Sequence, residues 1–522
     1  METFGQALRR IRRERSLSLR ALALRARFDF SYLGQIERGA RWPSPEVAAG
    51  CDTALGTGGA LAGIYAREQQ ARDGLRLAQR QPTPAHTQHL GSDLWTSLAV
   101  PTLGTLINQG GEDVNRRGFL VNTTLAAGGL ASLPFSHPGH AADHSGYGRE
   151  LTLIGPAGKM FTGSAVSALA FPASDGDRIL AAVPEGLAGG RFLRRPQRGL
   201  VVGITTSEDG PKMYALDSRQ ARRRLIHAAP GAQLIIPPAY VLDDVTLGLV
   251  WAVANLDDAL LGDDTLLTDC QRQLAGYETL NRSAAGRESA ADLAAVSQAW
   301  LGSDFCARYI LRHTEALTAL PSFWTREQRG EEASTWLLFT HKYAYLQAVT
   351  GRFAATGEQV TRSFCIPPEQ VTTSPAPERV LLLLAAALME SFGIRVEVTA
   401  APEYTAVEGF VSDGRHAILA NWVGGDSLWH VDVTTSRPVL REYADATGHT
   451  TAHSVITASD PARRLRSLAA YLDLNWATVT IRCAQLADYG LAGLTQPRSR
   501  LMALTGAERA CEYLADLQHH TY

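Results

Sequence analysis

The chain of 522 residues is poor in lysine, with only three, and its six cysteines lie far apart. No two cysteines form a Cys-x-x-Cys pair, which argues against a zinc ribbon or a dithiol redox motif and indicates reduced thiols. The longest apolar run, Val380–Met389, is much shorter than the ~20 residues that a membrane helix needs. The N-terminus has no signal-peptide core. We therefore expect a cytoplasmic protein without a membrane partner.

Positive charge is concentrated at the start of the chain. Residues 1–50 contain ten arginines, no lysine and five acidic residues, a net charge of +5, whereas the whole chain has a net charge of −2. A basic head on a mildly acidic body predicts an anionic partner at one end only. The length and the composition, with 45 % hydrophobic residues, predict a soluble protein of about three or four domains.

The basic head has the local signals of several short helices. Ser18 can cap a second helix, and Asp29 can cap a third helix over Phe30–Arg38. A fourth helix, opened by Pro43–Glu46, runs to Leu55. Since each local signal agrees with the next, the first 70 residues are predicted to form a small all-α domain.

The run LRRIRRERSLSLRALA…FSYLGQIERGARWPSPE, within residues 4–68, resembles the phage-repressor-type (Xre-like) helix-turn-helix family. In that family the third helix lies in the major groove of double-stranded DNA, and the loop that follows it binds phosphate. The resemblance implies base-facing positions at Phe30, Ser31 and Gln35, flanking positions at Tyr32 and Arg38, a phosphate contact from Arg41, and a structural ion pair between Arg12 and Glu37.

Two positions depart from the family pattern. Leu19 and Phe30 stand where the family often has polar residues. Phe30 can touch a thymine methyl group but cannot read a pattern of donors and acceptors, so Gln35 is expected to make most of the direct base contacts. A single head contacts few base pairs, which predicts a homodimer on paired half-sites. The alternative is that Arg9, Arg10, Arg13 and Arg15 only form a solvated helix face and do not contact DNA.

Residues 71–150 are polar and rich in Gly, Pro, His and Ser, and we predict a linker with a helical segment near 115–133. The pair Arg116-Arg117 resembles a twin-arginine export signal, but its position deep inside the chain favours a docking helix. Further along, Gly155–Lys159 (GPAGK) resembles a phosphate loop. It lacks the flanking residues of a Walker motif, so no nucleotide site is expected there.

Residues 291–375 are helical in pattern and rich in aromatic side chains, which can line a ligand pocket or simply form core. The blocks WLGSDFCAR and REQRGEEA resemble blocks in long actinobacterial regulators with repressor-type heads. The charged residues of the second block are expected to form exposed ion pairs, namely Arg326, Glu327, Arg329, Glu331 and Glu332.

The C-terminal region reads as helix, strand, a turn at Asp413-Gly414, and strand, followed by a further helix and a strand at 476–483. Over residues 378–475 this order weakly resembles one half of the phospholipase D-type fold. Asp413 and Gly414 fit that family's pattern, but Ala406 and Glu408 stand where the family has its His nucleophile and its Lys, so the resemblance implies a degenerate enzyme. The alternative is an α/β domain of other ancestry.

Together these features predict a multidomain protein with an all-α helix-turn-helix N-terminal domain followed by a mixed α/β and helical body. The predicted segments are 1–70 (DNA-binding domain), 71–150 (linker), 151–290 (mixed α/β domain), 291–375 (helical region) and 376–522 (C-terminal α/β domain). We expect a sequence-specific, dimeric transcription regulator with a possible small-molecule effector and no metal or other cofactor. The open alternatives are an enzyme or nucleotide-linked effector tethered to DNA by the head, and a recruitment scaffold without a small-molecule response.

Overall fold

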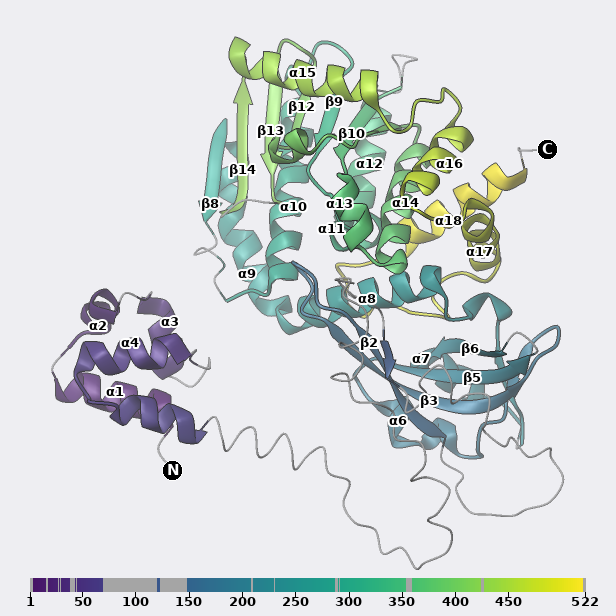
Figure 1. Cartoon of the computed structure of the whole chain (residues 1–522), viewed down its shortest axis with the longest axis horizontal. Coiled ribbons are helices and arrows are strands. Elements are labelled where there is room, and N and C mark those ends of the chain that lie inside the picture. Colours follow the sequence, from purple (N-terminus) through teal and green to yellow (C-terminus); the bar gives the residue numbers. More distant parts are fainter. Residues whose placement is uncertain are drawn as a thin grey trace, which may run out of the picture. The chain divides into compact units, whose positions relative to one another are not determined.

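The computed structural model describes residues 3–68, 120–122 and 148–519, apart from short gaps. These gaps are 16, 27, 29, 38–42, 44, 208–209, 230, 287–289, 291, 354–358 and 424–426. The chain divides into two compact units, residues 1–106 and residues 107–522 (Figure 1).

The first unit is a small helical domain with its own core. Its helices are α1 (Phe4–Glu14), α2 (Leu19–Ala26), α3 (Phe30–Glu37) and α4 (Pro45–Leu55), and residues 60–68 are also helical. These bounds agree closely with those expected from the caps. The side chain of Ser18 accepts a hydrogen bond from the backbone N–H of Ala21 (3.1 Å) and so caps α2. The buried residues of the core include Leu8, Leu22, Leu33, Val47 and Leu61.

The second unit begins with a seven-stranded sheet. Its strands follow the order β1-β2-β3-β4-β7, and β5 joins β3 to β6. The segment near 115–133 was expected to be helical, but residues 120–122 form strand β1, antiparallel to β2. Backbone pairing with β2 overrides the local pattern there. The bounds are β1 (Leu120–Asn122), β2 (Arg149–Gly155), β3 (Ser164–Ser174), β4 (Ile179–Ala181), β5 (Gly199–Ser207), β6 (Gly210–Asp217), β7 (Leu234–Ile236), α6 (Arg191–Arg194) and α7 (Ser218–Ile226).

A second seven-stranded sheet has the order β11-β10-β9-β12-β13-β14-β8. Strands β9, β10 and β11 are parallel to one another, whereas β12, β13, β14 and β8 continue the sheet in antiparallel fashion. This sheet crosses both boundaries that the sequence suggested, at 290 and at 375, because β8, β9 and β10 pair with later strands. The bounds are β8 (Arg282–Gly286), β9 (Ser322–Thr325), β10 (Thr361–Cys365), β11 (Arg395–Thr399), β12 (Phe410–Ser412), β13 (Ala417–Asn421) and β14 (Ser427–Thr434).

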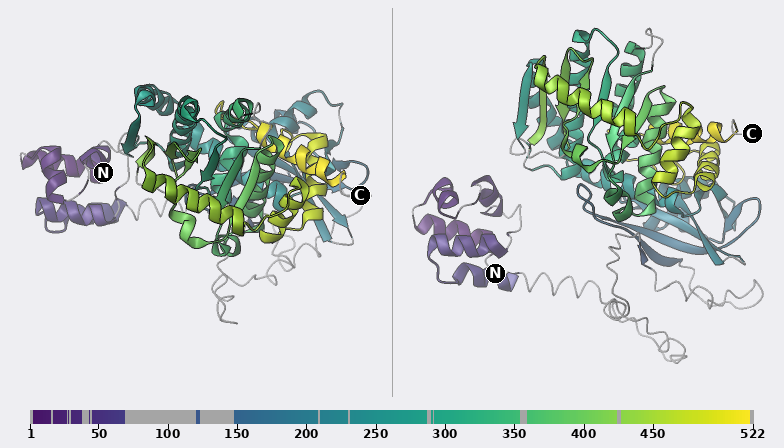
Figure 2. Two further views of the ribbon diagram at one scale, coloured as in Figure 1. Left: turned by 90° about the horizontal axis from the view of Figure 1, so that it is seen from above. Right: turned by 45° about the horizontal axis from the view of Figure 1, so that its top comes forward.

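Helices cover both faces of the second sheet (Figures 1 and 2). Neighbouring residues of β9 point to opposite faces: Phe323 joins the main core under α10, α12 and α14, and Trp324 joins a small cluster under α15. In that cluster the rings of Phe410 and Tyr443 stack with centroids 3.9 Å apart. The helices are α8 (Asp244–Gly262), α9 (Asp264–Leu274), α10 (Ala295–His313), α11 (Gly330–Leu338), α12 (Thr340–Phe353), α13 (Pro368–Thr373), α14 (Ala376–Ser391), α15 (Arg437–His453), α16 (Pro461–Tyr471), α17 (Trp476–Tyr489) and α18 (Thr505–His519).

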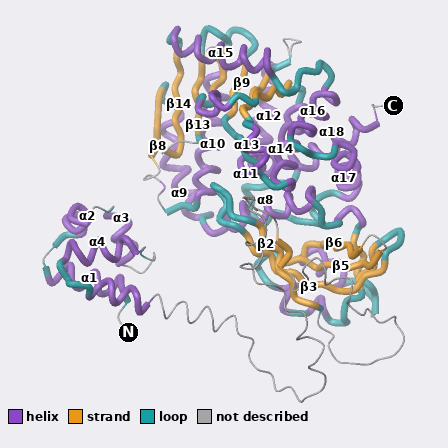
Figure 3. Tube along the Cα trace, viewed as in Figure 1, coloured by secondary structure: helices purple, strands orange, loops and turns teal. Residues whose placement is uncertain are grey.

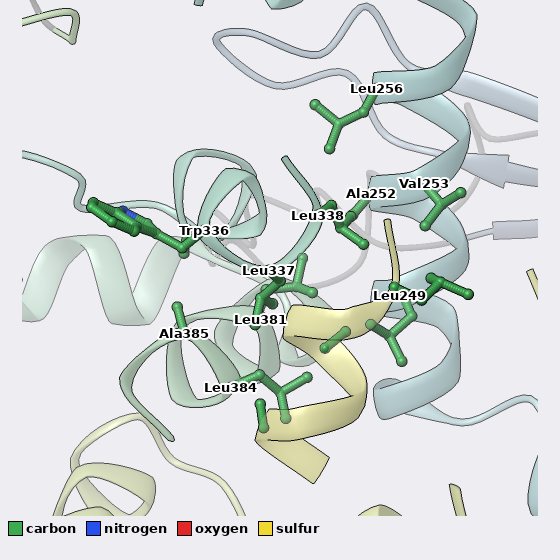
Figure 4. Close-up of a cluster of buried hydrophobic side chains, with 14 of the residues drawn as sticks. Leu249, Ala252, Val253, Leu256, Trp336, Leu337, Leu338, Leu381, Leu384 and Ala385 are labelled. Carbon is green, nitrogen blue, oxygen red and sulfur yellow. The ribbon is translucent and has the colours of Figure 1, made fainter. Parts of the chain in front are cut away.

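Helix α8 connects the two sheets into one core (Figure 3). It is long and apolar enough to cross a membrane by length and composition, but most of it is buried inside the protein. Figure 4 shows Ala252 of α8 beside Leu338 of α11, and both belong to the same buried core as Leu249, Leu256 and Leu381 of α14. A Cβ at Gly248 would lie 2.5 Å from the carbonyl oxygen of Pro377. Glycine therefore permits the close approach of α8 to α14.

One expected strand is a helix. Residues 476–483 are rich in Thr, Val and Ile, which favours a strand, but they form the first half of α17. Asn475 caps this helix, since its side chain accepts a hydrogen bond from the backbone N–H of Thr478 (2.9 Å). Packing of α17 against α18 buries Val479 and Cys483. The cap and this packing outweigh the β propensity of the segment.

Candidate DNA-binding site

Helices α2 and α3 form the centre of the head. Three residues separate the end of α2 at Ala26 from the start of α3 at Phe30, the length of connection found in helix-turn-helix motifs. The two helices contact each other, and Leu22 of α2 and Leu33 of α3 are fully buried in the same core. Helix α4 packs closely against the turn. A Cβ on Gly50 would lie only 2.6 Å from the ring of Phe28, so this position has no room for a side chain.

Helix α1 holds the end of α3. The guanidinium of Arg12 donates to both carboxylate oxygens of Glu37, with Nε–Oε1 at 2.6 Å and Nη2–Oε2 at 2.8 Å. Its third nitrogen, Nη1, donates to the carbonyl oxygen of Leu17 (2.7 Å). The hydrogen bond to Glu37 raises the pKa of Arg12. The two side chains are only 12 % and 6 % exposed, so this bidentate pair fixes α3 against α1.

A carboxylate also organises the rest of the head. Asp52 of α4 accepts hydrogen bonds from the backbone N–H groups of Gly59 (2.7 Å) and Leu61 (3.0 Å), and so caps the helix at 60–68. That helix returns to the start of the chain, where Glu68 accepts from the backbone N–H of Phe4 (2.8 Å). Polar contacts therefore join the helix at 60–68 to α4 at its start and to the N-terminal end of α1 at its end.

The structure places the expected base-facing residues on one short helix. Phe30, Ser31, Tyr32 and Gln35 lie in the first two turns of α3. The remaining two expected contacts, Arg38 and Arg41, lie outside the described residues.

Exposed arginines add positive charge to the same unit. Arg9, Arg10 and Arg13 of α1, and Arg15 directly after it, are exposed to solvent. Two of these have partners within the head: Arg10 pairs with Glu14 (2.9 Å), and Arg15 donates to the carbonyl oxygen of Gly56 (3.2 Å). Such side chains can approach a phosphate backbone without desolvating a buried group.

The comparison with protein families agrees with this geometry. Residues 3–62 match a family described as a helix-turn-helix domain. No curated protein and no solved structure matches the chain. The head is therefore a helix-turn-helix domain. A domain of this class supports the interpretation of the chain as a DNA-binding regulator.

The phosphate-like loop of the body holds a carboxylate of the protein itself. Backbone N–H groups of Lys159, Met160 and Phe161 donate to Glu331 at 2.8, 3.0 and 3.1 Å. A Cβ on Gly158 would overlap the same carboxylate. The end of the GPAGK segment and the two residues after it thus bind an anion through backbone N–H groups, and this anion is a side chain of the protein itself.

The acidic residues of the REQRGEEA block are buried, contrary to the expectation of exposed ion pairs. Glu327, Glu331 and Glu332 are 4 %, 1 % and 6 % exposed. Glu332 accepts from the backbone N–H of Gln328 (2.8 Å) and caps α11, and burial raises its pKa to about 7. For Glu331 the sequence gives no sign of this burial, because its partners lie about 170 positions away in the chain.

Asp413 has a structural role in the turn between β12 and β13. Burial opposes its ionisation, but hydrogen bonds from the backbone N–H groups of Thr318, His416 and Arg415 lower its pKa to about 2. At the other positions of the phospholipase D-like pattern, Ala406 ends a short 3-10 turn, and Glu408 lies 3.3 Å from His430. The Asp413 carboxylate thus accepts its hydrogen bonds from within the fold and stabilises this turn.

Part of the aromatic set lines a cavity in the second sheet. Phe323, Trp324, Trp336 and Tyr345 are among its walls, whereas Phe305 is packed against Trp429 in the core. Sequence reasoning missed the polar residues of this cavity, above all Lys342, Arg362 and Asn421. The sequence contains one signal for this site: Lys342, one of only three lysines in the chain, lies among the aromatic residues of α12.

Proposed function

We propose that the chain is a sequence-specific transcription regulator rather than an enzyme, and that it places α3 in the major groove of its operator. The observation that carries this proposal is the helix-turn-helix geometry of α2 and α3 within residues matched to that family. In this arrangement Gln35 is the main reader of base edges, and Arg41 binds phosphate. Ser31 and Phe30 make additional base contacts, while Tyr32 and Arg38 flank them.

The proposed roles differ in a measurable way. Gln35→Ala and Arg41→Ala should both weaken binding to the preferred DNA sequence, which can be selected from random duplexes with the full chain. Only Gln35→Ala should relax the sequence preference, since a phosphate contact carries no base information. Arg41→Ala should instead reduce the dependence of the affinity on salt. Equal relaxation by both variants would contradict these assignments.

We further propose that residues 148–522 join two heads into a dimer in the cytoplasm. A head with few direct readers needs a second head on a paired half-site to reach useful specificity. Analytical ultracentrifugation of the full chain should therefore give a dimer, and the selected DNA should contain two half-sites. A monomer bound to a single half-site would refute the dimeric arrangement while leaving DNA binding itself in place.

A further inference from the structure

A cavity of about 50 Å³ lies at one edge of the second sheet, where the direction of the strands changes. From β9 the chain proceeds to β10 and β11 on one side, and then returns to β12 on the other side of β9. Thr325 and Glu327 lie at the carboxyl end of β9, and Asn421 ends β13 at the same edge. Ligands of open α/β sheets bind at this kind of topological switch point.

The cavity holds more positive than negative buried charge. Lys342 and Arg362 are 3 % and 4 % exposed, and Glu327 is the one buried carboxylate among the described residues that line it. The Lys342 Nζ lies 3.3 Å from Glu327 Oε1, and Trp336 Nε1 donates to the same oxygen (3.0 Å). Among the described residues, no carboxylate pairs with Arg362. A buried charge without a counter-charge is costly, and burial already lowers the pKa of Lys342 to about 8.

Two buried donors at this cavity lack a hydrogen-bond partner among the described residues. Arg362 donates through Nη1 to Thr325 (2.8 Å), but its Nε is unpaired. Asn421 accepts through Oδ1 from the backbone N–H of Gly409, which leaves its Nδ2 unpaired. Both residues are more than nine-tenths buried. Buried donors of this kind usually have a partner, so these two indicate an acceptor that the described residues do not supply.

Aromatic rings form part of the remaining walls. Lys342 Nζ lies 3.7 Å from the centroid of the Trp336 ring and 4.6 Å from that of Trp422. The Arg362 guanidinium lies 4.7 Å from the centroid of the Phe323 ring and 4.9 Å from that of Trp336. These contacts hold both cations in place without neutralising them. The walls can therefore accept a short apolar group next to the anionic one.

We infer that this cavity binds a small monocarboxylate, with its carboxylate between Lys342, Arg362 and Asn421 and its short apolar part against the indole rings. A negative charge matches the buried guanidinium of Arg362, which no carboxylate among the described residues pairs with. The cavity volume corresponds to roughly three or four water-sized positions, which suits a short acid. Its role as an effector site rests on the proposed function, but binding can be measured without DNA, so the two proposals can fail separately.

The test is thermal unfolding of the full chain with acetate or propionate at constant ionic strength, with acetamide, propionamide and inorganic phosphate as comparison solutes. A carboxylate should raise the unfolding temperature saturably, because it binds the folded state. The neutral amides and phosphate should not. Equal shifts from the amides, equal shifts from phosphate, or no saturable shift with either carboxylate would each overturn the inference.

Asn421→Asp provides a sharp variant because it keeps the acceptor for Gly409 and replaces the unpaired donor with a negative charge. It should raise the unfolding temperature of the ligand-free chain and weaken carboxylate binding on the order of a hundredfold. Arg272→Met is the matched control, because it changes the net charge by the same amount as Asn421→Asp but at an arginine whose side chain is 73 % exposed. It should bind the carboxylate like the wild type. Full carboxylate binding by Asn421→Asp, or equal loss in both variants, would refute the assignment.

Discussion

The Arg12–Glu37 pair should decide whether the head is folded. In Arg12→Met the Glu37 carboxylate, with a side chain only 6 % exposed, loses two charge-assisted hydrogen bonds and stays buried without a partner. The carbonyl oxygen of Leu17 loses its donor as well. Removal of one partner of a buried pair costs about 3–5 kcal/mol. The head has fewer than 70 residues, and domains of that size have only about 3–10 kcal/mol of stability.

Hydrogen–deuterium exchange of the full chain measures this loss directly. A cost of about 3 kcal/mol should lower the protection of the amides in α1 and α3 by roughly a hundredfold, since about 1.4 kcal/mol corresponds to a factor of ten. Amides of α14, in the other compact unit, provide the internal control and should keep their protection. DNA binding should fall in parallel, because α3 is then no longer held against α1.

The double variant Arg12→Met/Glu37→Leu separates the cost of an unpaired charge from the value of the pair. An apolar pair of similar volume often replaces a buried ion pair at little cost, so the double variant should recover most of the protection that Arg12→Met loses. Unchanged protection of α3 in the single variant would show that the pair does not stabilise the head. A double variant as unstable as the single one would refute the desolvation argument.

Three further predictions concern the body. Glu331→Ala leaves three backbone N–H groups unpaired and should cost at least about 3 kcal/mol in urea unfolding; Glu331→Gln, which keeps an acceptor, should cost clearly less. Gly158→Ala should cost about 1–3 kcal/mol because its Cβ overlaps Glu331, and strictly additive effects in Gly158→Ala/Glu331→Ala would contradict that contact. Glu332 has its pKa raised from 4.5 to about 7, so the folded state binds the extra proton and stability should fall, by up to about 3 kcal/mol, as the pH rises between these values. Glu332→Gln should remove that part of the slope, and identical pH profiles would exclude Glu332 as its source.

The helices of the head could be predicted from local sequence signals alone. Its helices are short, and their bounds depend on residues a few positions away, as with Ser18 before α2 and the proline-led start of α4. The ion pair of Arg12 and Glu37 followed from a family pattern that runs over adjacent helices. In the body, the α14–β11 step and the hairpin at Asp413-Gly414 were also readable, because each is a local unit.

The contacts of the polar residues in the body, by contrast, depend on the tertiary fold. Glu331 meets its three donors about 170 positions away, and no local pattern distinguishes it from a solvated glutamate. The division of residues 151–522 into three segments did not anticipate a sheet that joins β8 to β14 and β9 to β12. The same sheet brings Lys342, Arg362 and Asn421 to one cavity. Their meeting depends on strand order and burial, which are properties of the folded chain and not of any segment.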